Sequence, residues 1–327
     1  MNLKDYASGN IMSGQLCRIE KITQHKDRIS FMLCDKDTQL PAYVSARLYS
    51  YEEICAFAKA PALVDGIYLP ENNKLQVKIK RIEKAENTSP KDLADLYVCI
   101  APELLNGYIE TIRKYASCVR AQGYRDLLNL YFSKENLKLM RTMPATHTRQ
   151  CSLGGGMLAA TANLTTMAVA MANHYTKLGN GVYTAPINWD LLITGSLLHL
   201  AGNLVYFSPE QPHLKTTTGV NQGFASCEQN MILYYVYSNN LVLSDAELSL
   251  LLGVVAQCNE YGAGVKGCCI EAILLGGIYR TYCSMDRFDN ELQTLADSSN
   301  PYGFSTKLNR YASEDAINRI QQGKEAG

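Results

Sequence analysis

Residues 191–204, with the sequence LLITGSLLHLAGNL, decide the fold prediction for the larger part of this chain. The apolar residues fall on every side of a helix rather than along one stripe, a pattern typical of a helix buried in a core. A single histidine, His199, lies near the end of the run. We therefore predict a buried helix over residues 190–204, with the His199 ring hydrogen-bonded to a backbone carbonyl or to Asn203.

Helical patterns continue on both sides of this stretch. Ser133 with Asn136, and Ser244 with Glu247, are typical helix starts, because an N-cap serine accepts a bond from the backbone three residues later. The predicted helices cover residues 90–97, 102–122, 124–132, 134–142, 155–177, 190–204, 228–238, 244–261 and 270–295, with a last helix over 313–322.

The N-terminal part predicts strands instead. Five segments mix β-branched and aromatic residues with partial alternation: GQLCRIEKIT, RISFMLCD, LPAYVSA, ALVDGIYLP and KLQVKIKRIEKA. A short helical segment, residues 49–59, follows the third. Five strands with a helix after the third is the order of an OB-fold barrel.

These patterns predict an α+β multidomain chain. Residues 1–87 form a small OB-fold-like barrel, residues 88–297 an all-α domain, and residues 298–327 a polar C-terminal tail. The boundary falls in ENTSPKDL, where Ser89 can cap a helix that has Pro90 at its first position.

Composition limits the classes of function. Of 327 residues, 47% are apolar and 19% charged, and the formal net charge is zero, so any nucleic-acid binding needs a local basic patch. We expect no membrane association, since no apolar run approaches the roughly 18 residues that span a bilayer. The 11 cysteines are scattered through apolar runs without a signal peptide, which predicts reduced core thiols in a cytoplasmic protein.

Several local strings, with the order of elements, resemble the YhaM-type proteins, 3′–5′ exoribonucleases in which an OB-fold precedes a helical HD domain. LMRTMPATHTRQCSLGGGMLAATANL resembles a family segment with Pro-Ala before histidines and then Gly-Gly-Leu-Leu-Glu-His-Thr. LLHLAGNL resembles Leu-His-Asp-Leu-Gly-Lys, and EYGAGVKGCCIEAILL resembles a segment that begins Glu-Trp-Gly-Ser-Pro-Val. The resemblance covers residues 12–290 and implies an HD-like domain over 88–297. The MobH-type conjugative relaxases carry a related segment and are a second candidate family.

The resemblance also implies that the metal ligands of the HD site are missing. The family's metal histidine falls on Ala160, the aspartate of its His-Asp pair on Leu200, and its late aspartate on Tyr279. Only His199 stays in register, and His147 lies where an early histidine is expected. One histidine cannot hold the divalent metal that activates water for hydrolysis. These five positions therefore predict a vestigial site with no metal, no cofactor and no catalytic residue.

The predicted barrel is the better candidate for a functional surface. OB-folds bind single strands in a groove that combines cations with aromatic stacking faces, and Tyr43 lies on the third strand, where a residue facing that groove is expected. Alternating lysines on a strand are equally typical of any exposed barrel face. The available cations are Arg18, Lys21, Lys26, Arg28, Lys78, Lys80 and Arg81, and the available rings are Phe31, Tyr43, Tyr49 and Tyr51.

Three hypotheses follow. The first is a non-catalytic relative of the exonuclease that binds single-stranded DNA or RNA, or a protein partner, in a conjugation, mobile-element or RNA-processing system. The second is an active metal-dependent phosphohydrolase or exonuclease with a rearranged site built from His199, His147 and one or both of Asp286 and Asp289. The third is a structural assembly subunit, for which 21 tyrosines against 7 phenylalanines supply an oligomer interface.

Overall fold

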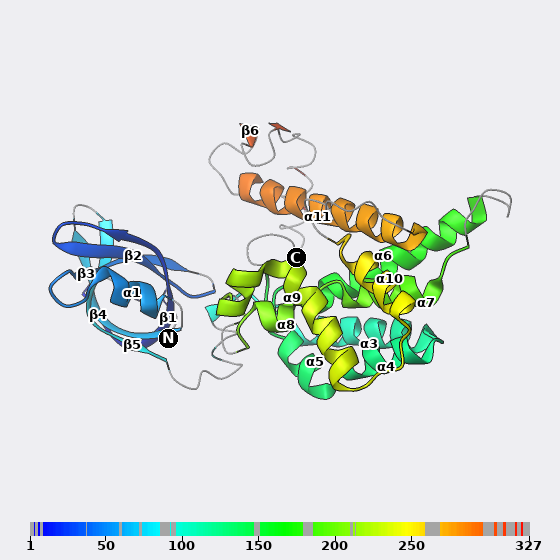
Figure 1. Cartoon of the computed structure of the whole chain (residues 1–327). Helices are drawn as coiled ribbons and strands as arrows, with labels where there is room; N and C mark the ends of the chain where they lie inside the picture. Colours follow the sequence, from blue (N-terminus) through cyan, green and yellow to red (C-terminus); the bar gives the residue numbers. More distant parts are fainter. Residues whose placement is uncertain are drawn as a thin grey trace.

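The computed structural model describes residues 9–36, 38–58, 61–71, 74–85, 96–146, 151–178, 186–209, 214–258 and 269–296, with residues 3, 6, 92, 212, 304–305, 310–311, 318 and 322 in addition. Within them, an N-terminal sheet precedes a set of helices (Figure 1). The predicted α+β class is therefore confirmed. Buried apolar residues form two separate clusters, one inside the sheet and one among the helices.

Five strands form a closed barrel in the order β1-β2-β3-β5-β4. The first half of β1 pairs with β4 and its second half with β2, and a register shift interrupts each pairing. Gly14 and Lys21 lie at these shifts with positive φ angles of 56° and 53°, and such bulges bend a strand so that a sheet can close. The elements are β1 Ile11–Gln24, β2 Arg28–Cys34, β3 Gln39–Ser45, α1 Tyr51–Phe57, β4 Ala62–Glu71 and β5 Lys74–Lys84.

Alternation along the strands fills the barrel. Val77 and Ile79 on β5 are buried, while Lys78 and Lys80 are exposed, as the sequence pattern predicts. The helix α1 packs against β1 and β5 and contributes Ile54, which is fully buried in the same core. The outer face of the barrel is consequently polar and available for contacts.

The remaining described residues form helices. Ser133 accepts a bond from the backbone of Asn136, and Ser244 forms a capping box with Glu247, so both predicted helix starts are confirmed. The helices are α3 Pro102–Cys118, α4 Gln122–Tyr131, α5 Lys134–Met140, α6 Gly156–Leu178, α7 Trp189–Leu198, α8 Asn203–Tyr206, α9 Thr217–Ser238, α10 Asp245–Val255 and α11 Ile270–Ala296.

The helix α7 is at the centre of this part. It packs against α3, α4, α6, α10 and α11, and every residue from Leu191 to Leu198 is buried. Gly195 allows the close approach of α10, since a Cβ at this position would lie 2.6 Å from Val254 Cγ1. The prediction of a buried helix is confirmed for these residues.

The predicted helix over 190–204 is wrong at residues 199–202, which form a turn. The helix α7 ends at Leu198, and a turn separates it from α8. In this turn Gly202 touches the backbone of α9, because a Cβ there would lie 2.5 Å from Glu228 N. The Asn203 side-chain amide donates to the carbonyls of Pro144 and Ala145, each at 2.9 Å. These tertiary contacts hold the turn where local pattern favours a continuous helix.

The helix α9 begins at Thr217, well before the predicted start at Glu228. Thr216 caps it, with its hydroxyl accepting from Gly219 N at 2.8 Å. Gly223 has φ 75° and ψ 167°, which introduces a kink. Glycines and polar residues lower the helix propensity of this segment, and the sequence pattern therefore concealed its first half.

The predicted domain boundary near residue 87 lies outside the described residues. Within the predicted C-terminal tail, β6 Phe304–Ser305 pairs with β7 Arg310–Tyr311 in an antiparallel ladder, while most of the predicted helix over 313–322 lies outside the described residues. In the described part of the chain, no helix combines the length and the apolarity that crossing a membrane requires.

Candidate functional site

The outer face of β2, β3 and β5 brings three of the predicted residues together. Ser30 on β2 pairs with Tyr43 on β3, and Tyr43 pairs with Lys78 on β5. Directly paired residues project from the same face of a sheet. The Tyr43 ring is half-buried, and the guanidinium carbon of Arg28 lies 5.2 Å from its centroid in a cation–π contact. An aromatic ring thus lies between a cation of β2 and a cation of β5.

Three further predicted cations flank this group along the chain. Lys26 is exposed in the turn that leads from β1 to Arg28. Lys80 and Arg81 follow on β5, both exposed, at the point where the pairing of β4 with β5 shifts register. Arg81 forms an ion pair with Glu83 on the same strand. Lys26 and Lys80 therefore extend the positive surface, and the charge of Arg81 is partly neutralised.

The structure assigns Arg18 to a different contact. Its guanidinium forms an ion pair with Glu20 and donates to the backbone carbonyl of Asp35 at 3.2 Å. It also lies 4.7 Å from the ring centroid of Tyr97, which follows the barrel in the chain. Burial raises the pKa of Tyr97, and the charge of Arg18 opposes that rise. Arg18 therefore contacts the start of the helical part.

Lys21 is also removed from the Tyr43 group. It lies in a bulge of β1, and its Nζ donates to Gln39 Oε1 at 3.2 Å. Gln39 is four residues before Tyr43 on β3, or about 13 Å along an extended strand. The eight predicted barrel residues thus divide into one group around Tyr43 and a second group, Arg18 and Lys21, elsewhere on the surface.

Two of the other rings are not available for stacking. Phe31 is 2% exposed because it points inward from β2, so its proposed role in stacking is wrong. The Tyr49 hydroxyl accepts from the backbone N–H of Ile82 at 3.0 Å, and its ring packs edge-on against Phe57. Of Phe31, Tyr43 and Tyr49, Tyr43 is the ring that lies beside cations on the outer face.

The second candidate region is the interior of the helical part, around His199. This residue is fully buried, and its Nδ1 lies 2.7 Å from the carbonyl oxygen of Ser196. The proton is therefore on Nδ1, which donates, while Nε2 has no partner among the described residues. Burial lowers the pKa of His199 to about 4, and the bond to Ser196 opposes this shift. The predicted core histidine bonded to a backbone carbonyl is confirmed.

Two positions of the predicted vestigial site meet in this interior. The Tyr279 ring, on α11, packs edge-on against the His199 ring with centroids 5.9 Å apart. Burial raises the pKa of the Tyr279 phenol, and so does the charge of Glu228. Ala160 and Leu200 are also buried, at 1% and 2% exposure. The fifth predicted residue, His147, lies outside the described residues.

Sequence reasoning missed Glu228, which is also fully buried on α9. Its Oε1 has no hydrogen-bond partner in the described part of the chain, and burial raises the pKa of this carboxyl well above its ordinary value. Its charge also raises the pKa of Cys258, although burial is the larger cause there. Glu228, Ile232 and Val236 are spaced four apart and all buried. That apolar stripe is the signal which could have located Glu228 in the core.

The interior therefore offers a buried imidazole, a phenol and a carboxyl whose pKa burial raises. Among the described residues, no three side chains of His, Cys, Asp or Glu lie close enough together to hold a metal ion. Asp286 and Asp289, which the second hypothesis requires, lie on α11 at half-buried and exposed positions. The buried groups of His199, Tyr279 and Glu228 are therefore suited to hydrogen bonding inside a core.

The two regions differ in their chemistry. The barrel face carries cations and an aromatic ring at its surface, while the candidate residues of the helical interior are buried. The resemblance to the YhaM-type family rests on the residues quoted above, because no protein-family model, curated protein or solved structure matches this chain.

Proposed function

We propose that this protein binds single-stranded nucleic acid through the β2–β3–β5 face of its barrel. The observation that carries this proposal is the group formed by Arg28, Tyr43 and Lys78. A half-buried ring presents a face for stacking on a base, and flanking cations attract the phosphates on either side. Neither interaction requires a particular base, so binding tolerates different sequences.

The topology of the barrel supports the same proposal. β1 pairs with both β2 and β4, β3 pairs in parallel with β5, and α1 lies between β3 and β4 in the chain. On this basis we propose that the barrel is an OB-fold, a fold whose oligonucleotide-binding surface includes the face of strands 2 and 3 and the loop between strands 1 and 2. Tyr43 and Arg28 lie on those strands, and Lys26 lies in that loop.

We further propose that the helical part is an HD-like scaffold that performs no hydrolysis. Support comes from the contact of His199 with Tyr279 at the end of the central helix, where the resemblance expects a metal histidine beside an aspartate. A phenol and a neutral imidazole in a closed core do not supply the hard oxygen ligands that a hydrolytic metal needs. The function is then binding, with the helices as its support.

Fluorescence anisotropy with labelled single-stranded DNA and RNA tests the proposal. Affinity should fall steeply as salt rises, because phosphate contacts release counterions. Tyr43→Ala should weaken binding about tenfold, since stacking on one base contributes roughly 1–3 kcal/mol, whereas Tyr43→Phe should retain it.

Charge reversal supplies the matched comparison. Lys78→Glu should abolish most of the binding, while Lys84→Glu changes the same charge on the same strand, at an exposed position six residues away. Equal effects of the two reversals, or binding that does not depend on salt, would refute the assignment of this face.

A further inference from the structure

A groove between α3 and α5 has no role in the function proposed above. It encloses about 660 Å³, which is the size of a small-molecule site. Its residues recur at helical spacing on each wall, so that one face of α3 opposes one face of α5. The lining is Asn106, Ile109, Glu110, Arg113, Lys134, Glu135, Leu137, Lys138 and Arg141.

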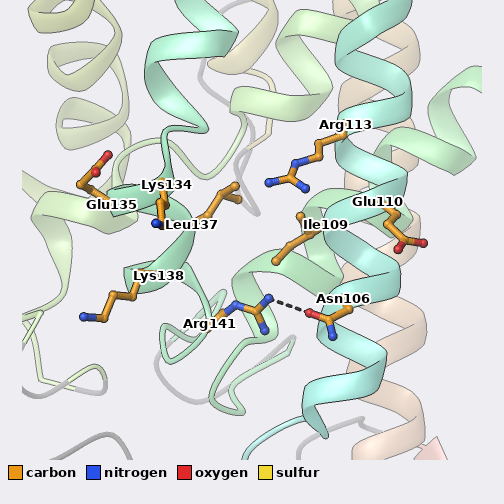
Figure 2. A pocket seen from close by; sticks show the side chains of 9 residues that line it. All are labelled: Asn106, Ile109, Glu110, Arg113, Lys134, Glu135, Leu137, Lys138 and Arg141. Atoms are coloured by element: carbon orange, nitrogen blue, oxygen red, sulfur yellow. Dashed lines mark hydrogen bonds between the residues drawn. The ribbon is translucent and has the colours of Figure 1, made fainter.

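The groove is positively charged where the side chains converge. Arg113 from α3 and Arg141 just after α5 point into the space between the helices, while Glu110 and Glu135 point away from it (Figure 2). In the described part of the chain, neither Arg113 nor the two groove lysines have an ion pair or a hydrogen bond. No ion pair within 4 Å therefore neutralises these three side chains in the described part of the chain.

One of the two arginines is held in position. Arg141 Nη2 donates to Asn106 Oδ1 at 2.6 Å across the groove (Figure 2). This bond uses one guanidinium N–H and leaves the others for a ligand. An arginine fork that is already oriented loses less freedom on binding an anion, and its geometry fits phosphate oxygens in pairs.

The floor of the groove is apolar. Ile109 and Leu137 line it from the two walls and are 5% and 6% exposed, so they close the groove against the core and leave little apolar surface. The volume is larger than a simple inorganic anion needs, which favours a bulkier ligand that carries phosphates.

We infer that this groove binds the phosphates of a nucleotide, with the base and sugar in the remaining volume between α3 and α5. The phosphates come either from a free nucleoside polyphosphate or from a nucleotide within a strand. Arg113 and Arg141 contact them, and Lys134 and Lys138 add positive charge at the rim. The inference does not depend on the proposed function of the barrel face, because the groove lies between α3 and α5.

Calorimetric titration of the full chain with ATP, and separately with single-stranded oligodeoxythymidine, tests the inference. Arg113→Glu should weaken binding about tenfold or more, because it removes a charge-assisted contact and adds a repulsive charge. Lys114→Glu makes a charge reversal at the next, exposed residue of α3, outside the groove, and should change affinity less than about twofold. Lys138→Glu is a second exposed variant, on the opposite wall, and should weaken binding less than Arg113→Glu, because its side chain points away from the groove (Figure 2).

The two arms distinguish the source of the phosphate and separate this site from the barrel. Loss of ATP binding in Arg113→Glu but not in Lys114→Glu supports a free nucleotide, whatever the barrel binds. Binding of the oligonucleotide alone, weakened by Arg113→Glu in a Lys78→Glu background that disables the barrel, supports a strand. If neither probe binds in that background, or if the reversals at 113 and 114 have equal effects, the inference is wrong.

Discussion

The buried histidine predicts a specific dependence of stability on pH. Burial lowers the pKa of His199 to about 4 from its ordinary value of 6.5, so the folded chain keeps this imidazole neutral over that whole interval. In the unfolded chain the same imidazole is in water and takes up a proton below its ordinary pKa. Between these two values the unfolded state therefore binds more protons than the folded state.

The sign and size of the effect follow from that difference. When the unfolded state binds more protons, the free energy of unfolding falls as pH falls. The contribution of His199 is thus fully present above pH 6.5 and is lost progressively down to about pH 4. A difference of one pKa unit corresponds to about 1.4 kcal/mol, so the whole interval corresponds to about 3 kcal/mol.

Urea unfolding of the wild type and of His199→Gln at several pH values measures this contribution. Glutamine can still donate to the Ser196 carbonyl but does not titrate. At neutral pH the variant should be less stable by about 1–3 kcal/mol, because the buried imidazole is replaced by a smaller polar group. Toward about pH 4 the wild type should have lost about 3 kcal/mol more than the variant, so the gap should close and, where it started small, reverse in sign.

The control is His174→Gln, which removes an exposed histidine of α6. Carboxylates elsewhere titrate in all three proteins, so the comparison uses differences between the curves and not their shapes. If the curves of the wild type and of His199→Gln stay parallel through this interval, the imidazole is not shielded in the way that the structure implies.

Three further substitutions test other parts of the structure. In the wild type, the free energy of unfolding should fall as pH rises above 4.5, by up to about 1.4 kcal/mol per pH unit, because the folded chain retains a proton on Glu228 that the unfolded chain releases. This loss should disappear in Glu228→Gln. Urea unfolding at acidic and alkaline pH measures it. Gly202→Ala should destabilise the chain by about 1–3 kcal/mol in thermal unfolding, since its Cβ would meet backbone atoms of residue 228. Gly277→Ala has open space around it on α11 and should stabilise the chain by about 0.4–1 kcal/mol. Asp190→Ala should cost about 1–2 kcal/mol, because its two carboxylate oxygens accept the backbone N–H groups of Arg120 and Ala121, just before α4. An unchanged urea midpoint would contradict this contribution.

Local physics made much of the fold predictable from sequence. Alternation on β5 identified Val77 as inward and Lys78 as outward, and serine caps located the starts of α5 and α10. These features depend on residues close together in the chain. The same alternation places Phe31 inside the barrel, so its assignment to a stacking surface was avoidable.

Tertiary contacts decided what the pattern could not. The break after Leu198 depends on Gly202 meeting the backbone of Glu228 and on Asn203 reaching the carbonyls of residues 144 and 145. A glycine at the start of α9 has a similar role, because Gly219 lies against the backbone of Tyr206. In sequence, these glycines lower helix propensity, and only the packed structure shows that they permit close contact.

The candidate site on the barrel was predictable residue by residue but not as an arrangement. Arg28, Tyr43 and Lys78 come from three strands, and their alignment depends on the parallel pairing of β3 with β5. No local signal fixes that register. Because sequence does not give the register, it does not separate Arg18 from Arg28, Tyr43 and Lys78. The contact of Arg18 with Tyr97 places it toward the helical part.

The polar atoms buried in the helical core are costly for a protein that uses this part only as a scaffold. His199 Nε2, Asn203 Oδ1 and Glu228 Oε1 all lack partners among the described residues, and leaving a buried polar group unpaired costs about 1–3 kcal/mol. Apolar residues of similar volume would avoid that cost. His199 and Asn203 flank the turn in which Gly202 packs against the backbone of Glu228, so the three residues belong to neighbouring elements of this core. Packing alone would not select such a set of unpaired polar groups.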